Sequence, residues 1–177
     1  MSPTFEREKF RELVVYIAEK TADDPSFGDT KFNKTLYWID AFGYSHLGQP
    51  VTGARYFKLP KGPAARPLIP VRQELAAEGA VEVQEPTSKY EPRLTRARRA
   101  PDLGLFTKEE LALVDDIIRQ ISGFSAATIS EVSHDLPGWN LVALGEDIPY
   151  STALISTEPL RDETMARVRT AAARLGW

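Results

Sequence analysis

The fold is decided by residues 31–63, which read KFNKTLYWIDAFGYSHLGQPVTGARYFKLPKGP. The first half of this stretch predicts a helix that begins at Asp29 or Thr30, either of which can cap it, and ends near Leu47. Its expected inner stripe, spaced at three and four, is Phe32, Leu36, Ile39 and Phe42. Three further aromatic residues lie off the stripe, namely Tyr37, Trp38 and Tyr44. A helix that is apolar around most of its circumference must be covered on several sides, so we expect it at the centre of the fold.

The second half of the stretch is dense in glycine and proline, which favour turns over long strands. We expect at most a short extended piece, from Ala54 to Leu59, and a turn at Lys61-Gly62-Pro63. The glycines are spaced irregularly, and neither GxGxxG nor GxxxxGKS/T occurs. A phosphate-binding loop is therefore not expected.

Helices and a hairpin are predicted immediately outside this stretch. One helix should run from Phe5 to Lys20 and another from Pro67 to Glu78, where Gly79 provides a left-handed C-cap residue. After Gly79 the period changes to two, because valine alternates with polar residues in residues 81–84, and this predicts a strand. A second short run at Arg93 to Thr95 completes an expected β-hairpin.

The clearest helix start in the chain is FTKEEL, in which Thr107 and Glu110 form a capping box. Ser125 can cap the helix that follows, whose expected buried side is Ile129 and Val132. Each of these helices begins with a side chain that can accept a hydrogen bond from the first turn.

A last helix is expected in residues 157–177. Its inward face is formed by Leu160, Val168, Ala172 and Leu175. Together these patterns predict a single α+β domain over residues 1–177. It should be mostly α-helical, with about six helices and a small antiparallel β-hairpin or sheet.

The composition is that of a soluble globular protein, with 42% hydrophobic and 27% charged residues in a chain of 177. A net charge of −3 gives no global attraction to nucleic acid or anionic lipid. The chain has no cysteine, so disulfides, thiolate metal sites and cysteine nucleophiles are excluded. No run approaches the ~18 apolar residues of a membrane span, and the N-terminus is charged where a signal peptide is apolar. We expect a cytoplasmic protein without membrane contact, metal or cofactor.

One of only two histidines lies in SHDLPGW, residues 133–139. Ser133, His134 and Asp135 are the residue types of a hydrolase triad, but neighbours on a helix point about 100° apart and cannot bond in series. We interpret the motif as a helix end that is stopped by the proline. There His134 bonds a free carbonyl and Trp139 packs back over it. We therefore expect no enzymatic activity.

A basic stretch follows the predicted first strand of the hairpin. It contains five cations, Lys89, Arg93, Arg96, Arg98 and Arg99, and one carboxylate, Glu91, for a local net charge of +4. A helix followed by a basic hairpin is also the pattern of a winged helix, whose wing lays arginines along DNA phosphates. The alternatives are a solvated loop or a protein-contact surface. The preceding helix is poorly suited to reading a DNA groove, because Arg72 and Gln73 stand beside acidic residues.

Three segments, in this order, resemble the signatures of the Panacea domain, the SocA-like antitoxin family. They are residues 31–63, FTKEELALVDDII and SAATISEVSHDLPGW. The matching positions are Lys31, Phe32, Asn33, Lys34, Leu36, Tyr37, Trp38, Gly48, Pro50, Val51, Thr52, Gly53, Tyr56, Gly62, Pro63, Ser133, His134 and Trp139. The resemblance covers about residues 30–139 and leaves 140–177 as a C-terminal extension that ends in a helix. The proline-rich KLPKGPAARP departs from the usual arrangement of the family.

The resemblance implies a mostly helical, non-enzymatic antitoxin that neutralises a co-encoded toxin by binding it, although some relatives instead deliver a toxin to a protease. It also implies a structural role for the motif residues, in which the polar pair Asn33 and Lys34 fixes a neighbouring loop. The residues expected to contact the toxin are aromatic side chains and arginines, which give large contact areas. They are Tyr44, Tyr56, Phe57, Arg93, Arg96, Arg98 and Arg99. The alternative function is a winged-helix-like DNA-binding regulator that uses the basic hairpin, residues 89–99.

Overall fold

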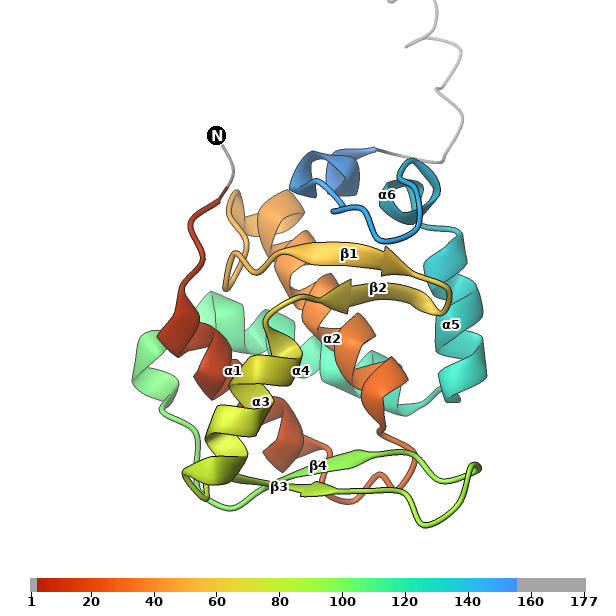
Figure 1. Cartoon of the computed structure of the whole chain (residues 1–177). Helices are drawn as coiled ribbons and strands as arrows, with labels where there is room; N and C mark the ends of the chain where they lie inside the picture. The colour runs from red at the N-terminus through yellow and green to blue at the C-terminus, as the bar shows by residue number, and fades with distance from the viewer. Residues whose placement is uncertain (1–2, 156–177) are drawn as a thin grey trace, which may run out of the picture.

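Helix α2 (Asp29–Phe42) runs through the centre of a computed structural model that describes residues 3–155 of the chain (Figure 1). It packs against α4 (Lys108–Ser122), α5 (Ala126–His134) and strand β2 (Gly62–Ala65). Coverage on several sides is what an all-round apolar helix requires, and the central position predicted for it is confirmed.

The expected inner stripe of α2 is confirmed at three of its four positions. Phe32, Leu36 and Ile39 are at most 1% exposed, whereas Phe42 is 43% exposed and the prediction for it is wrong. Phe42 is the last residue of α2 and lines an open apolar hollow instead of the core. The helix then continues to the expected end as a wider π-helical turn, η1 (Gly43–Leu47).

Neither Asp29 nor Thr30 caps α2, contrary to the prediction. The N-cap residue is Gly28, and no side chain bonds the first turn there. The Asp29 carboxylate instead accepts hydrogen bonds from Arg72 at 2.5 Å and Arg93 at 3.1 Å. Charge-assisted bonds to distant arginines are stronger than a neutral cap bond, and the local sequence does not reveal them.

The other helices among residues 3–155 are α1 (Arg7–Lys20), α3 (Leu68–Ala77) and the short α6 (Pro137–Asn140). Two 3₁₀ turns are also present: η2 (Leu103–Leu105) precedes α4, and η3 (Tyr150–Leu154) follows α6. Residues from five helices, α1 to α5, meet in the core, and the fully buried ones include Phe10, Leu36, Val71 and Val114. The predicted α+β class, mostly helical with about six helices, is confirmed.

The first hairpin pairs β1 (Tyr56–Leu59) antiparallel with β2, and Leu59 lies opposite Gly62. The turn therefore consists of Pro60 and Lys61, and the predicted turn at Lys61-Gly62-Pro63 is wrong. Pro63 is compatible with this strand because the alternation of the ladder turns its nitrogen away from β1.

The second hairpin is confirmed. It pairs β3 (Val81–Gln84) with β4 (Leu94–Ala97), so the second strand extends two residues further than predicted. Gly79, which precedes it, has φ 74°, the left-handed conformation expected after α3. Figure 1 shows this hairpin at the lower margin of the molecule, away from the β1–β2 hairpin.

Both predicted N-terminal caps of the C-terminal half are confirmed. The Thr107 side chain accepts from the Glu110 amide at 3.2 Å, while the Glu110 carboxylate accepts from the Thr107 amide at 2.8 Å. The Ser125 hydroxyl accepts from the Thr128 amide at 3.1 Å.

The buried face of α5 differs in part from the prediction. Ile129 is 2% exposed, as expected, but Val132 is 49% exposed. The fully buried neighbour is Ser133, which lies about 100° from Val132 around the helix. The glycine-containing strand β2 packs against this side of α5, and a small serine fits there where a valine does not.

The helix predicted in residues 157–177, with Leu160, Val168, Ala172 and Leu175, lies outside the described residues. Within residues 3–155, none of the helices has the length and apolarity needed to cross a membrane.

Candidate partner-binding site

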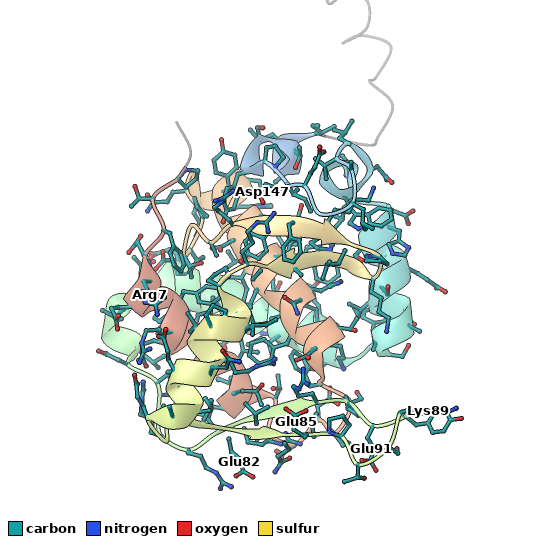
Figure 2. The ribbon with its side chains drawn as sticks, in the orientation of Figure 1. Arg7, Glu82, Glu85, Lys89, Glu91 and Asp147 are labelled. Carbon is teal, nitrogen blue, oxygen red and sulfur yellow. The ribbon has the colours of Figure 1, made fainter. Side chains whose placement is uncertain are left out.

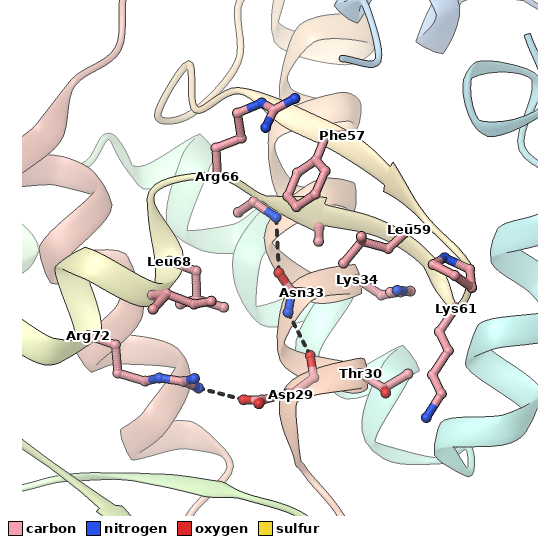
Figure 3. A pocket seen from close by; sticks show the side chains of 14 residues that line it. Asp29, Thr30, Asn33, Lys34, Phe57, Leu59, Lys61, Arg66, Leu68 and Arg72 are labelled. Carbon is pink, nitrogen blue, oxygen red and sulfur yellow. Dashed lines mark hydrogen bonds and ion pairs between the residues drawn. The ribbon is translucent and has the colours of Figure 1, made fainter. Parts of the chain in front are cut away.

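Asn33 and Lys34 of α2 hold the outer edge of β2 (Figure 3). The Asn33 Oδ1 accepts from the Ala65 amide at 2.9 Å, and its Nδ2 donates to the Asp29 carbonyl at 2.9 Å. The Lys34 Nζ donates to the Pro63 carbonyl at 3.1 Å. The ladder turns these two backbone groups of β2 away from β1, so side chains of the helix satisfy them where another strand would otherwise pair.

Gly62 lets the hairpin approach α2 and α5 closely. Its φ is 106°, and a Cβ atom at this position would collide with the Ser133 hydroxyl and lie 2.6 Å from the Lys34 Cε. Ser133 is fully buried and donates to the Ser130 carbonyl at 2.7 Å. Its hydroxyl therefore supports the packing of α5 and does not bond His134.

His134 and Trp139 bond the β1–β2 hairpin at its turn and at the end of β1. The His134 Nε2 donates to the Pro60 carbonyl at 3.0 Å, and the Trp139 Nε1 donates to the Leu59 carbonyl at 3.0 Å. The two rings are stacked with centroids 4.3 Å apart. The carbonyl that His134 bonds belongs to the hairpin turn and not to the end of α5. The SHDLPGW segment therefore attaches α5 and α6 to the β1–β2 hairpin.

A buried carboxylate, Asp40, organises the loop that leads into β1. Its two oxygens accept from the Thr52 amide and hydroxyl, both at 2.6 Å, and from the Tyr56 hydroxyl at 2.7 Å. Burial raises the pKa of the Asp40 carboxyl, and these bonds oppose that rise. Sequence reasoning missed Asp40, although a carboxylate beside the stripe residue Ile39 in an apolar run was a signal.

Tyr56 is only 2% exposed, so the expectation that its ring contacts a partner is wrong. Its hydroxyl is committed to Asp40 and to the Leu36 carbonyl at 2.8 Å, and Tyr37 packs edge-on against it at 5.4 Å between centroids. The period of two in β1 turns Tyr56 inward and Phe57 outward.

Lys31 and Gly53 occupy structural positions as well. The buried Lys31 Nζ donates to the Asp24 carboxylate at 2.7 Å. Gly53 has φ 68°, and a Cβ atom there would collide with the Thr4 carbonyl. These two motif residues hold the segments that precede α2 and α1.

The arginines of the basic hairpin are largely engaged within the molecule. Arg93 binds Asp29 at 3.1 Å and Glu85 at 2.9 Å, Arg98 pairs with Glu82, and Arg99 binds Glu12 at 2.6 Å. Arg96 donates to the Thr21 carbonyl at 3.1 Å. Glu82 and Glu85 lie along the hairpin, and Lys89 points outward at its tip (Figure 2). Neutralised arginines give little attraction to phosphates, which disfavours the winged-helix alternative.

A groove with a volume of about 480 Å³ lies between the β1–β2 hairpin, the first half of α2 and α3 (Figure 3). Its apolar lining includes Phe57, Leu59, Leu68 and Ile69. Its charged lining is formed by Asp29, Lys34, Lys61, Arg66 and Arg72. Phe57 is the only expected partner-contact aromatic residue in this groove, and the Arg66 guanidinium lies over its ring at 4.4 Å. Tyr44 lies elsewhere and packs against Tyr150.

The charge of the groove is predominantly positive. Asp29, its one carboxylate, is paired with Arg72, and Arg66 is paired with Asp147 outside the groove. Neither Lys34 nor Lys61 pairs with a carboxylate within residues 3–155. Burial, and to a lesser degree the charge of Lys61, lowers the pKa of Lys34 to about 8. The groove thus combines an apolar floor with two lysines that have no carboxylate partner within residues 3–155.

A second, more apolar hollow of about 330 Å³ lies between α2, α4 and α5. It is lined chiefly by Trp38, Phe42, Ile121, Phe124 and Val132. Sequence reasoning missed this hollow because it assigned Phe42 and Val132 to the core. In the part of the chain that the structure describes, no cluster of histidine and carboxylate side chains is arranged to hold a metal ion.

A family model described as antitoxin SocA-like, Panacea domain, matches residues 32–140. The match runs from Phe32, within α2, to Asn140, the end of α6. It includes all three motif segments except Lys31, the first residue of the first segment. No curated protein and no solved structure matches the chain.

Proposed function

Because the chain belongs to the antitoxin SocA-like family with the Panacea domain, we propose that it neutralises a co-encoded toxin by binding the toxin protein directly. The family match over residues 32–140 is the observation that carries this proposal. The proposed encounter takes place in the cytoplasm and needs no cofactor.

Neutralisation by contact is consistent with how the polar side chains of the motifs are used. Asn33, Lys34, His134 and Trp139 all bond the backbone of the β1–β2 hairpin. A catalytic group must be able to reach a substrate, and these groups are already committed to the fold. Their arrangement holds the hairpin in place beside the groove.

We place the toxin contact at this groove. Interfaces gain most of their energy from apolar and aromatic anchors that exclude water, while charges at the rim set orientation and encounter rate. Phe57, Leu59 and Ile69 provide such an apolar surface, and Ile69 is 62% exposed. Lys61 supplies an exposed positive rim. The complementary toxin surface is an apolar side chain flanked by carboxylates.

The test is growth of a host that expresses each neighbouring open reading frame, with and without this protein. We expect one neighbour to arrest growth and the wild-type chain to restore it. Ile69→Glu and Lys61→Glu should each weaken binding of the purified toxin about tenfold or more, because they place negative charge in the contact.

The matched control is Lys108→Glu, the same charge reversal at an exposed position in the first turn of α4, outside the groove. It should bind and rescue like the wild-type chain, because a carboxylate is favourable at a helix N-terminus. A toxic neighbour that the wild-type chain neither binds nor neutralises would overturn the proposal.

A further inference from the structure

The two hairpins together have four outer strand edges, and those of the β1–β2 hairpin are both closed. The edge of β1 is covered by residues 145–148, since the Lys58 amide donates to the Glu146 carbonyl at 2.9 Å and the Ile148 amide to the Tyr56 carbonyl at 2.8 Å. The edge of β2 is closed by side chains of α2, as described above. Closed edges prevent unwanted strand pairing.

The outer edge of β4 is also covered. Leu94 forms an isolated bridge with Gly28, Thr95 is only 4% exposed, and the Arg96 side chain bonds the Thr21 carbonyl. This edge faces the segment between α1 and α2 and cannot take a further strand.

The outer edge of β3 differs from the other three at Val83, whereas the first residue of the strand, Val81, is only 3% exposed. The Arg98 amide donates to the Ala80 carbonyl at 2.9 Å, which fixes the alternation of the ladder. The backbone groups of Val81 and Val83 therefore point away from β4. Among residues 3–155, no hydrogen bond outside the ladder reaches the amide or carbonyl of either valine. Figure 1 shows β3 as the outer strand of this hairpin.

A cleft of about 460 Å³ borders this open edge. It lies between α3 and β3, and its lining includes Ile69, Gln73, Ala76 and Val83. Ile69 and Arg72 line both this cleft and the groove proposed to contact the toxin. The open edge is therefore continuous with that surface.

We propose that the edge of β3 accepts an extended segment of the toxin as a third strand of the β3–β4 sheet, and this rests on the proposed function. The added strand bonds the amide and carbonyl of Val83, because Val81 is only 3% exposed, and one of its apolar side chains enters the cleft against Ile69. Backbone bonds then supply affinity, while the cleft selects the side chain.

The test is Val83→Pro, with Val83→Thr as its matched control. Proline removes an amide that β4 does not use, so the hairpin persists, but the toxin strand loses a donor and meets the ring. Threonine keeps the amide and a β-branched shape. We expect Val83→Pro to weaken toxin binding about tenfold or more and Val83→Thr to stay within about threefold of wild type.

Hydrogen exchange of the wild-type chain gives a second readout that does not depend on the variant. The Val83 amide should exchange faster than those of Glu82 and Gln84 in the free protein and become protected when the toxin is bound. The toxin is the neighbouring gene product that the wild-type chain neutralises.

The outcomes separate the two proposals. This inference alone is overturned if Val83→Pro leaves toxin binding unchanged and the Val83 amide of the wild-type chain stays unprotected when the toxin is bound. Absence of any toxin binding by the wild-type chain overturns the proposed function and the inference together. If the wild-type chain self-associates and Val83→Pro abolishes this self-association, the edge of β3 pairs with a second copy, and the proposal of a toxin strand is overturned.

Discussion

At the residue scale, two of the buried ionisable side chains of α2, Asp40 and Lys34, have charged forms that are opposed by the same physical cause. Burial raises the pKa of the Asp40 carboxyl and lowers that of the Lys34 amine to about 8. Asp40 is compensated by bonds from Thr52 and Tyr56. Lys34 has one backbone acceptor, the Pro63 carbonyl, so its charge is the less well stabilised of the two.

The first prediction is that Lys34 makes the protein more stable as the pH rises above about 8. The unfolded chain keeps the lysine protonated up to its ordinary pKa of 10.5, whereas the folded chain releases the proton near 8. The unfolded state therefore binds more protons between these values, and the free energy of unfolding increases with pH in that window. Urea unfolding should show a gain of about 2 kcal/mol from Lys34 between about pH 7.5 and about pH 9.5.

The control is Lys34→Met, which keeps the length of the side chain and removes the titrating group. The difference in free energy of unfolding between wild type and variant should change with pH as stated, while other titrating groups cancel in it. A difference that is constant across the window would show that the amine keeps its ordinary pKa in the folded chain.

At the element scale, the β1–β2 hairpin is fixed from two sides by side chains. Asn33 and Lys34 bond β2 from α2. His134, the last residue of α5, bonds the turn at Pro60, and Trp139 of α6 bonds Leu59 at the end of β1. A two-stranded hairpin is marginal by itself, so these bonds allow it to form one wall of the groove. The glycine at position 62 permits the close approach.

The second prediction compares Gly62→Ala with Gly79→Ala. Both glycines have positive φ, at 106° and 74°, so both variants pay for backbone strain of about 1 kcal/mol. Only Gly62 has neighbours that a methyl group would strike, the Ser133 hydroxyl and Lys34, whereas nothing lies within 4 Å at Gly79. Gly62→Ala should lower the free energy of unfolding by about 2 kcal/mol more than Gly79→Ala.

Chemical denaturation of both variants checks this, and equal losses would mean that the hairpin can move away from α5 at little cost. Restoration of stability by the double variant Gly62→Ala with Ser133→Ala would identify the serine as the group that is struck. That coupling is expected because the two positions are in contact.

The accuracy of sequence reasoning depended on the range of the interactions involved. The caps at Thr107 and Ser125 and the left-handed Gly79 were predictable, because each depends on residues within one turn. Strand β2 was not, since Gly62 and Pro63 are poor strand residues and their pairing is imposed by α2 and α5. Asp29 failed as a cap for the same reason, through its distant arginines.

At the scale of the whole molecule, the distribution of charge pairing separates two surfaces. The arginines of residues 93–99 bond carboxylates or carbonyls in or next to α1, α2 and β3. These bonds connect the β3–β4 hairpin to the helices. The groove keeps Lys34 and Lys61 without carboxylate partners in the described part of the chain. The number of basic residues in the sequence indicated the β3–β4 hairpin as a binding surface, whereas the structure indicates the groove.

The candidate site was accordingly predictable only in part. Alternation in the aromatic strand was sufficient to suggest Phe57, but not to choose between it and Tyr56. Ile69 gave no sequence signal, because an exposed apolar residue on an amphipathic helix becomes informative only when its neighbours in space are known.

The third prediction is that the chain does not bind a short DNA duplex at physiological salt. Non-specific DNA affinity comes from cations that replace counterions on phosphates, and typical values of Kd lie at about 10⁻⁴ to 10⁻⁶ M. Arg93, Arg98 and Arg99 each already hold a carboxylate, and the chain carries a net charge of −3. Fluorescence anisotropy of a labelled duplex should therefore remain at the baseline up to about 100 µM protein.

The matched variant is Glu82→Gln with Glu85→Gln, which releases Arg98 and part of the pairing of Arg93 without changing the ladder. It should bind the duplex detectably at low salt, with an affinity that falls as salt is added, because its arginines regain the ability to displace counterions. Tight, salt-sensitive binding by the wild-type chain would instead mean that phosphates outcompete Glu82, Glu85 and Glu12 for these arginines. The basic hairpin would then serve as a wing, and the arginine pairs would be the closed state of a DNA-binding surface.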